Sequence, residues 1–315
     1  MKYVVLGTGG VGGFFGSKLA LAANDVWFVA RGKHLEAMKR SGLRIKSTAG
    51  DLAIPPGKMT DRVADAGAAD IVLFSVKSYD TEAAAAQLYP ILNDSSIVLC
   101  LQNGIDNEEK IKRIISRGVV YGGVAYISAR ITAPGEISET GGFQRIVFGP
   151  LDREIDDRTR DLREVFVHAG ITCDLSDAIV KDIWGKFVFI SSMGSFTALS
   201  RLTQGEILDS PQTLSLVFDA MREVQEVAWK LGVRLEPLDE AAMTKSLKRF
   251  DDTTRSSMYY DLMNEKPLEI EALNGTVIRL GQQVGVPTPI HRMIYTSLLP
   301  YHMKFLKSSS HQVSV

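Results

Sequence analysis

Residues 3–12 read YVVLGTGGVG, a β-branched run that passes directly into a glycine-rich turn. The glycines at positions 7, 9 and 12 fit G-x-G-x-x-G, a pattern that is informative where it follows a strand and opens a helix. Gly7 permits the tight turn, Gly9 lets the backbone approach a pyrophosphate, and Gly12 allows close packing of helix on strand. The helix N-terminus adds N–H donors and positive potential. We therefore predict a dinucleotide-binding loop, rather than a purely structural glycine turn, formed by Gly7, Thr8, Gly9, Gly10, Val11 and Gly12.

Short β-branched runs alternate with helical stretches through the first half of the chain. The runs YVVLG, DVWFVA, IVLFSVK and SIVLCLQN are separated or followed by helical stretches at about 11–23, 34–40, 81–92 and 107–115. This alternation is typical of a parallel doubly wound sheet. Pro134-Gly135 then predicts a hairpin turn and an antiparallel extension of the sheet. A helix at about 156–169 and the strand ITCDLS close this half.

The second half carries almost no strand signal after about Ser176. Helical patterns fall at 177–199, 213–231, 239–250 and 267–284, with another after Pro289. The length of 315 residues suits two domains of ordinary size. The sequence therefore predicts an α/β protein with a Rossmann-type doubly wound domain at residues 1–175 and an all-helical domain at residues 176–315.

Charge and composition limit the class of ligand. Lys and Arg number 36 against 37 Asp and Glu, a net charge of −1, so nothing suggests nucleic acid or an anionic membrane as partner. A small molecule is the expected ligand. The histidines and cysteines show no metal-ligand spacing, which predicts no metal site. Whether the helical domain packs on a second copy to form a homodimer stays open.

The compartment is expected to be the cytoplasm. The two cysteines, Cys100 and Cys173, stand in apolar or strand-like contexts, which favours buried thiols in a reducing compartment. The N-terminus lacks the order of segments of a signal peptide. The longest apolar stretch, residues 179–196, contains charged side chains and is not a membrane span.

Arg31 follows the second β-branched run, DVWFVA. An NAD enzyme usually places Asp or Glu about 20 residues past the glycines, where it accepts from the ribose 2′-OH. Here the run ends in Ala30, and Arg31, with Lys33 close by, offers a guanidinium that can pair bidentately with a 2′-phosphate. Because no carboxylate is expected there, the sequence favours NADP(H). The alternative is a solvated basic turn.

Two further runs end in the polar segments Ser75-Val76-Lys77 and Gln102-Asn103-Gly104. Ligands of open α/β sheets bind beyond the carboxyl ends of the strands, so both segments are expected to point into one crevice. Lys77 can serve as a cation near cofactor or substrate oxygen, and Asn103 can hydrogen-bond the nicotinamide side. Alternatively, Asn103-Gly104 is only a turn dipeptide and Lys77 only a charge that flanks a helix.

Lys186 stands in the apolar segment WGKFVFISSMG, residues 184–194. Its ammonium either snorkels to water or is held near an anionic group. A nicotinamide reductase of a ketone needs a proton donor for the oxygen, where negative charge develops. Lysine suits that role where burial and neighbouring groups bring its pKa towards the working pH.

An anionic partner for Lys186 is expected from the segment LEIEALNG, residues 268–275. The segment is predicted to be helical. Glu269 and Glu271 would then lie on different faces, because positions two apart on a helix do not share one. Only one of the two carboxylates is expected to face the ligand-binding crevice.

Together these residues resemble those of the ketopantoate reductase (2-dehydropantoate 2-reductase) family over nearly the whole chain. The resemblance implies an N-terminal Rossmann domain joined to a helical domain of the 6-phosphogluconate dehydrogenase C-terminal type. It also implies NADPH-dependent reduction of ketopantoate to pantoate in pantothenate and coenzyme A synthesis. The segments that carry it are the glycine loop, Arg31, Ser75-Val76-Lys77, Gln102-Asn103-Gly104, Trp184-Gly185-Lys186-Phe187, Ser256-Ser257-Met258, and Glu269 before Asn274-Gly275.

The resemblance also implies roles for single residues. Lys186 matches the catalytic lysine of the family and Glu269 its active-site glutamate. Ser257 matches a serine that contacts the substrate, and Asn103 the asparagine beside the nicotinamide. Lys186 is then not a snorkelling side chain.

The sequence departs from the family at two positions. Family members usually carry asparagines four and eight residues after the lysine, whereas this chain has Ile190 and Gly194. A site built to hydrogen-bond a hydroxyl loses discrimination when an aliphatic side chain replaces the partner. The alternatives therefore include a reductase of another 2-oxo acid, a 3-hydroxy acid dehydrogenase, and a non-catalytic NADPH-binding sensor.

Overall fold

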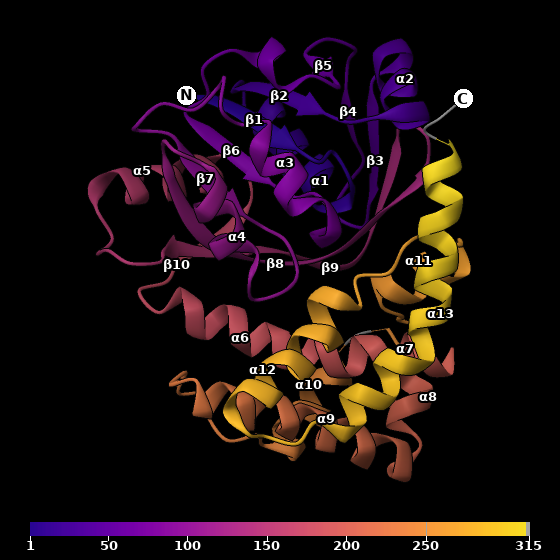
Figure 1. The fold of residues 1–315 in the computed structure, drawn as a ribbon. Coiled ribbons are helices and arrows are strands. Elements are labelled where there is room, and N and C mark those ends of the chain that lie inside the picture. Colours follow the sequence, from indigo (N-terminus) through magenta and orange to yellow (C-terminus); the bar gives the residue numbers. More distant parts are fainter. Residues whose placement is uncertain (250, 313–315) are drawn as a thin grey trace. The chain divides into compact units, whose positions relative to one another are not determined.

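The computed structural model describes residues 1–249 and 251–312 (Figure 1). The chain divides into two compact units, Met1–Ile183 and Trp184–Val315. The first unit is built on a mixed sheet with helices, and the described part of the second is helical. The expected fold class, an α/β Rossmann-type domain followed by an all-helical domain, is confirmed.

The first unit contains a ten-stranded sheet with the order β4-β3-β9-β8-β7-β6-β1-β2-β5, and β10 pairs with β9. From β5 to β8 the neighbouring strands are parallel. Their carboxyl ends therefore lie along one edge of the sheet. The strands are β1 (Lys2–Leu6), β2 (Asp25–Val29), β3 (Leu43–Ser47), β4 (Leu52–Ile54), β5 (Met59–Thr60), β6 (Ile71–Phe74), β7 (Ile97–Cys100), β8 (Val119–Ala133), β9 (Glu136–Pro150) and β10 (Thr172–Leu175).

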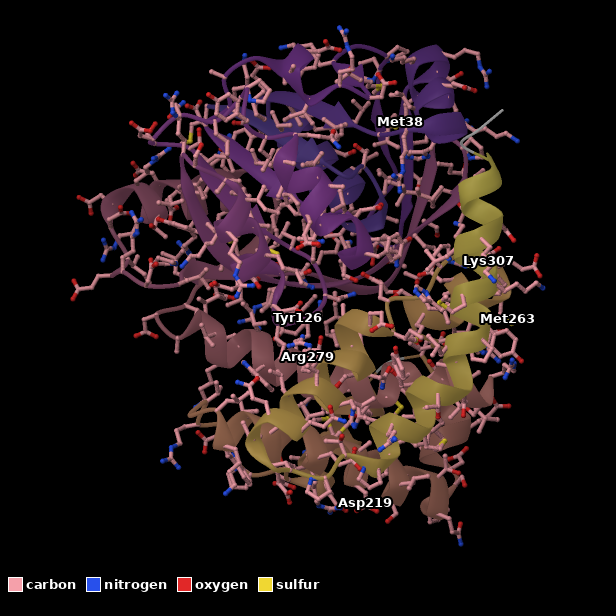
Figure 2. All side chains as sticks on the ribbon, viewed as in Figure 1. Met38, Tyr126, Asp219, Met263, Arg279 and Lys307 are labelled. Carbon is pink, nitrogen blue, oxygen red and sulfur yellow. The ribbon has the colours of Figure 1, made fainter. Side chains whose placement is uncertain are left out.

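The parallel strands are apolar on both faces, as a sheet covered by helices on each side requires. In β1, Tyr3 and Val5 belong to one buried cluster, and Val4 and Leu6 belong to another. Met38, labelled on α2 in Figure 2, is fully buried in the first cluster. The helical elements of this unit are α1 (Gly10–Leu21), α2 (Gly32–Ser41), η1 (Val63–Ala66), η2 (Ser78–Asp80), α3 (Thr81–Ala86), α4 (Asn107–Ile114) and α5 (Asp157–His168).

Helix α3 is shorter than the sequence predicts. The helix expected at 81–92 ends at Ala86. Pro90 has no N–H to continue a helix, and a proline disfavours helical backbone at the residue before it. Residues 87–91 form turns instead.

The predicted hairpin around Pro134-Gly135 is confirmed, because β8 and β9 pair antiparallel on either side of it. Helix α6 (Ile179–Phe189) begins against this hairpin, with Ile179 and Ile183 packed in one cluster with Val124 and Val147. The first compact unit accordingly extends to Ile183, whereas the domain boundary expected from the sequence follows residue 175.

Two short helices of the second unit, α8 (Gln204–Leu208) and α11 (Ser257–Met263), were not predicted from the sequence. The helix expected from Pro267 begins only at Glu271, and the helix expected at 239–250 is observed as α10, with residue 250 outside the described residues. The elements after α6 are η3 (Ile190–Gly194), α7 (Ser195–Ser200), α8 (Gln204–Leu208), α9 (Pro211–Lys230), α10 (Glu240–Leu247), α11 (Ser257–Met263), η4 (Glu271–Gly275), α12 (Thr276–Val284) and α13 (Pro289–Gln312).

Candidate active site

The glycine loop joins β1 to α1 and is fastened to the end of β2. The backbone N–H and the hydroxyl of Thr8 both donate to the Val29 carbonyl, at 3.0 and 2.9 Å. Gly9 is the N-cap of α1, and the first turn of that helix contains no acidic residue. The first N–H groups of an α-helix have no acceptor within the helix, so this end of α1 offers donors to an anion.

The glycines of the loop differ in the space around them. A Cβ at Gly9 would meet no atom within 4 Å, so the backbone there is open to a ligand. A Cβ at Gly12 would lie 2.2 Å from Ser75 Oγ and 2.4 Å from the Gly7 carbonyl oxygen, so no larger residue fits. Gly7 adopts φ +97°, which favours glycine. The loop thus has the open position and the tight positions that a pyrophosphate cradle needs, and it fits a dinucleotide.

Arg31 directly precedes α2 and is exposed, with an ion pair of 2.6 Å from its Nη2 to Asp80 Oδ2. Asp80 comes from η2, after β6, and the Arg31 side chain is 81% exposed. The premise that no carboxylate is available near Arg31 is therefore wrong. The sequence pattern gave no sign of Asp80, because it lies 49 residues further along the chain.

Ser75, Lys77 and Asn103 follow the carboxyl ends of β6 and β7. Ser75 Oγ donates to the Gly7 carbonyl at 2.9 Å, which links the loop after β6 to the glycine loop. Lys77 and Asn103 are both half-buried. Because β1, β2, β6 and β7 are parallel, the first unit brings the glycine loop, Arg31, Lys77 and Asn103 to one edge of the sheet.

Lys186 lies in the last turn of α6, in the second unit, and is half-buried. Its neighbours Trp184, Phe187 and Val188 are buried, with exposures of 6%, 1% and 5%. The rings of Trp184 and Phe187 meet edge to face, with centroids 5.8 Å apart. The lysine therefore projects from a helix turn whose neighbouring side chains Trp184, Phe187 and Val188 are fixed in the core.

Ile190 and Gly194 begin and end a π-helical segment, η3, directly after α6. A π-turn uses i→i+5 hydrogen bonds and so takes more residues per turn than an α-helix. Positions after Ile190 are therefore not spaced at the 3.6 residues per turn of an α-helix. The next residue, Ser195, is fully buried and donates to Asn274 Oδ1 at 2.8 Å.

Glu269 lies just before the π-helical segment η4 rather than on a helix, which corrects the helical placement expected for it. Its carbonyl accepts from the N–H of Leu273 at 3.0 Å, and the residue is only 7% exposed. Glu271 is exposed and accepts from the Tyr295 hydroxyl. The two carboxylates therefore have different surroundings, and Glu269 is the buried one.

Ser257 is the exposed first residue of α11. Its neighbour Ser256 caps this helix, accepting from the N–H of Tyr259 at 3.1 Å, and donates to the Gly194 carbonyl at 2.6 Å. Asn274 in η4 also bonds to η3, donating to the Ser191 carbonyl at 3.1 Å. Ser256 and Asn274 thus join the segments that carry Ser257 and Glu269 to the one that follows Lys186. No role was expected for either residue from the sequence.

Both cysteines are buried free thiols, as expected. Over the described ranges, no group of three or more His, Cys, Asp or Glu side chains is placed to hold a metal ion. No helix in the same ranges is long and apolar enough to cross a membrane.

Comparison with known proteins gives one family for both units. The model of Ketopantoate reductase PanE/ApbA matches residues 3–153, and that of its C-terminal part matches residues 178–301. The uncharacterized oxidoreductase YkpB of Bacillus subtilis is 29% identical over 96% of this chain and 99% of its own. A 2-dehydropantoate 2-reductase of Mesorhizobium japonicum is 31% identical over 92% of this chain and 94% of its own.

A solved structure agrees with these matches. The crystal structure of a PanE/ApbA family ketopantoate reductase from Ralstonia eutropha JMP134 superposes with a TM-score of 0.88 at 29% identity, covering 97% of this chain and 100% of that one. The family and the Rossmann-type fold imply a nicotinamide cofactor. The chain belongs to the ketopantoate reductase PanE/ApbA family of oxidoreductases.

Proposed function

We propose that the protein is an NADPH-dependent reductase of a 2-oxo acid, with ketopantoate as the leading substrate and pantoate as its product. The observation that carries the proposal is Lys186, a half-buried ammonium on a helix whose neighbouring side chains are buried. Family membership over both units supports the same reaction.

The glycine loop and Arg31 would hold the nucleotide. The donors at the start of α1 suit the pyrophosphate, and the open backbone at Gly9 lets it approach. Arg31 would pair with the 2′-phosphate, and its exposed position leaves it accessible. Lys77 and Asn103 would contact the nicotinamide end, with Asn103 also facing the substrate.

The chemical roles follow from what ketone reduction requires. When bound, the nicotinamide supplies the hydride, which is the chemistry of the cofactor. Lys186 donates a proton to the ketone oxygen as negative charge develops on it. Glu269 and Ser257 orient the substrate, and the carboxylate of Glu269 would hold the ammonium of Lys186 in place.

A second candidate is a paralogous reductase that acts on a different 2-oxo acid. Ile190 and Gly194, at the ends of η3, offer no side-chain hydrogen bond to a substrate hydroxyl. A site of this kind discriminates weakly in favour of a hydroxylated acid. The two candidates share the cofactor and Lys186 and differ only in the preferred substrate.

Two further functions are retained as alternatives. Oxidation of a 3-hydroxy acid, with NAD as preferred acceptor, would identify a 3-hydroxy acid dehydrogenase. Binding of NADPH without turnover of any oxo acid would favour a non-catalytic sensor. The proposed compartment is the cytoplasm, since both thiols are free, and a homodimer is one arrangement compatible with a helical second unit.

NADPH oxidation measured against a panel of 2-oxo acids that includes ketopantoate tests the proposal, with NADH run in parallel. Ketopantoate-dependent NADPH oxidation is the expected result. A strong preference for another 2-oxo acid supports the paralogous reductase, and turnover of no acid in the panel contradicts both candidates.

A further inference from the structure

Three buried polar side chains of the first unit form a continuous hydrogen-bond network behind the carboxyl ends of β6 and β7. Thr81, Gln102 and Asn107 are 1%, 8% and 0% exposed. Thr81 begins α3, Gln102 follows β7, and Asn107 begins α4. The role of this network is separate from those of the residues proposed to contact cofactor or substrate.

Gln102 spans the two strand ends. Its Nε2 donates to the Val76 carbonyl at 2.9 Å and to the Thr81 hydroxyl at 2.8 Å. A carbonyl oxygen only accepts, so the amide of Gln102 can face Val76 only through its nitrogen. The network itself therefore fixes the orientation of this side chain.

Thr81 connects Gln102 to the other members. Its hydroxyl lies 2.8 Å from the Ser78 carbonyl and 3.1 Å from Asn107 Oδ1, and its single proton can go to either. Asn107 Nδ2 donates in turn to the Asn103 carbonyl at 2.8 Å.

The carbonyls that the network holds lie beside the proposed cofactor contacts. Val76 and Ser78 flank Lys77 on either side, and the third carbonyl belongs to Asn103 itself. The backbone of Lys77 is thus bracketed by two anchors, and the same set of side chains fixes Asn103. The two loops are thus held by side chains that contact one another, through the proton that the Thr81 hydroxyl shares between the Ser78 carbonyl and Asn107 Oδ1.

We propose that Thr81, acting with Gln102 and Asn107, is a positioning residue that sets Lys77 and Asn103 at the spacing required by the nicotinamide end of the cofactor. The inference rests on the proposed function and names residues that do not themselves touch a ligand. A buried hydrogen-bonding group left without a partner carries its full desolvation cost, so losing the Thr81 hydroxyl would let the two loops rearrange.

The experiment compares Thr81→Val, which removes the hydroxyl at nearly constant volume, with Thr81→Ser, which keeps it. Dissociation constants are measured for NADPH and for 2′-phospho-ADP-ribose, the same nucleotide without nicotinamide. Thr159→Val is the matched control. Thr159 lies on another helix, α5, and is also fully buried. Its hydroxyl forms hydrogen bonds with the Tyr121 hydroxyl at 2.8 Å and with Asp156 Oδ1 at 2.6 Å.

T81V is expected to weaken NADPH binding by about tenfold, because it removes the hydroxyl that accepts from Gln102 and donates to the Ser78 carbonyl or Asn107. Binding of the nicotinamide-free fragment should stay within about twofold. T81S and T159V should bind both ligands as the unmodified protein does. General damage to the fold would weaken the binding of both ligands to the same extent.

Equal effects of T81V on the two ligands, or no effect on either, would overturn the inference. If T81V does not fold, Asn107→Ala replaces it in the same comparison, with the same two outcomes. Failure of the unmodified protein to bind NADPH would instead sink the proposed function, and the inference with it.

Discussion

Asp80 of η2, after β6, forms an ion pair with Arg31 after β2, with 2.6 Å between Oδ2 and Nη2. The Arg31 side chain is 81% exposed, and exposed pairs contribute little to stability, about 0 to 1 kcal/mol. The pair can therefore give way to a stronger anion. A 2′-phosphate would compete with Asp80 for the guanidinium, whereas a ribose 2′-OH could donate to the same carboxylate.

Arg31 and Asp80 should consequently act in opposite directions on cofactor choice. Arg31→Ala is expected to weaken NADPH binding by tenfold or more and to leave NADH binding nearly unchanged, because it removes a charge-assisted contact to phosphate. Asp80→Asn should strengthen NADPH binding severalfold by removing a competing negative charge. Dissociation constants for both nucleotides provide the measurement.

Lys58→Ala is the matched control for that series. Lys58 is an exposed cation of the same unit with its own carboxylate partner, Asp25, at 2.7 Å. The Lys58→Ala substitution should leave the affinities for NADPH and NADH unchanged. Equal loss of NADPH and NADH binding in Arg31→Ala would refute the assignment of Arg31 to the 2′-phosphate.

Gly9 and Gly12 should respond differently to alanine. Gly9→Ala meets no atom within 4 Å and should fold normally, but its methyl group would stand where the pyrophosphate is expected, raising the dissociation constant for NADPH by tenfold or more. Gly12→Ala collides with Ser75 Oγ and the Gly7 carbonyl and should lose about 1 to 3 kcal/mol of stability. Thermal unfolding and nucleotide titration separate the two effects. Normal NADPH binding by G9A would contradict the cradle.

Glu108 should make stability depend on pH. Burial raises the pKa of its carboxyl from 4.5 to about 7. Between pH 4.5 and 7 the folded protein keeps a proton that the unfolded chain releases, so the free energy of unfolding falls as pH rises through this window. This loss of stability is absent below pH 4.5 and complete above pH 7, where it lowers the free energy of unfolding by about 3 kcal/mol.

Glu108→Gln cannot ionise and should gain stability relative to the unmodified protein as pH rises from 4.5 to 7. Denaturant titrations at several pH values measure this difference. Glu109→Gln, a change at the exposed neighbour that pairs with Arg113, is the control and should show no such trend. A pH-independent difference for E108Q would show that the carboxyl does not stay protonated through this window.

Ile190→Asn tests the substrate preference. An amide at this position could hydrogen-bond a substrate hydroxyl, which the aliphatic side chain cannot do. We expect kcat/KM for ketopantoate to rise by tenfold or more relative to that for 2-oxoisovalerate, which lacks the hydroxymethyl group. An unchanged ratio would mean that residue 190 does not face the substrate.

Local patterns were sufficient to predict the architecture. The glycine turn after β1, the alternation of β-branched runs with helices, and Pro134-Gly135 each act over a few residues, and each produced the expected element. The prediction was wrong for α3, where a proline outweighs the helix-forming alanines. Pro90 limits α3, although the helix was expected to run past it.

The site was less predictable because several of its features depend on tertiary contacts. Asp80 reaches Arg31 only because the strands that precede them flank β1 in the sheet. The π-helical segments η3 and η4 follow from no simple periodicity, and both change the number of residues per turn next to Lys186 and Glu269. The Thr81, Gln102 and Asn107 network likewise joins residues from three separate elements.

The rate of hydride transfer in Lys186→Met tests the central claim most directly, measured in single turnovers with NADPH and the best 2-oxo acid of the panel. If Lys186 donates the proton, the rate should fall by about 10² to 10⁴. The dissociation constant for NADPH should stay within about twofold, since the glycine loop and Arg31 hold the nucleotide. A variant that transfers hydride at nearly the unmodified rate would show that another group protonates the ketone oxygen.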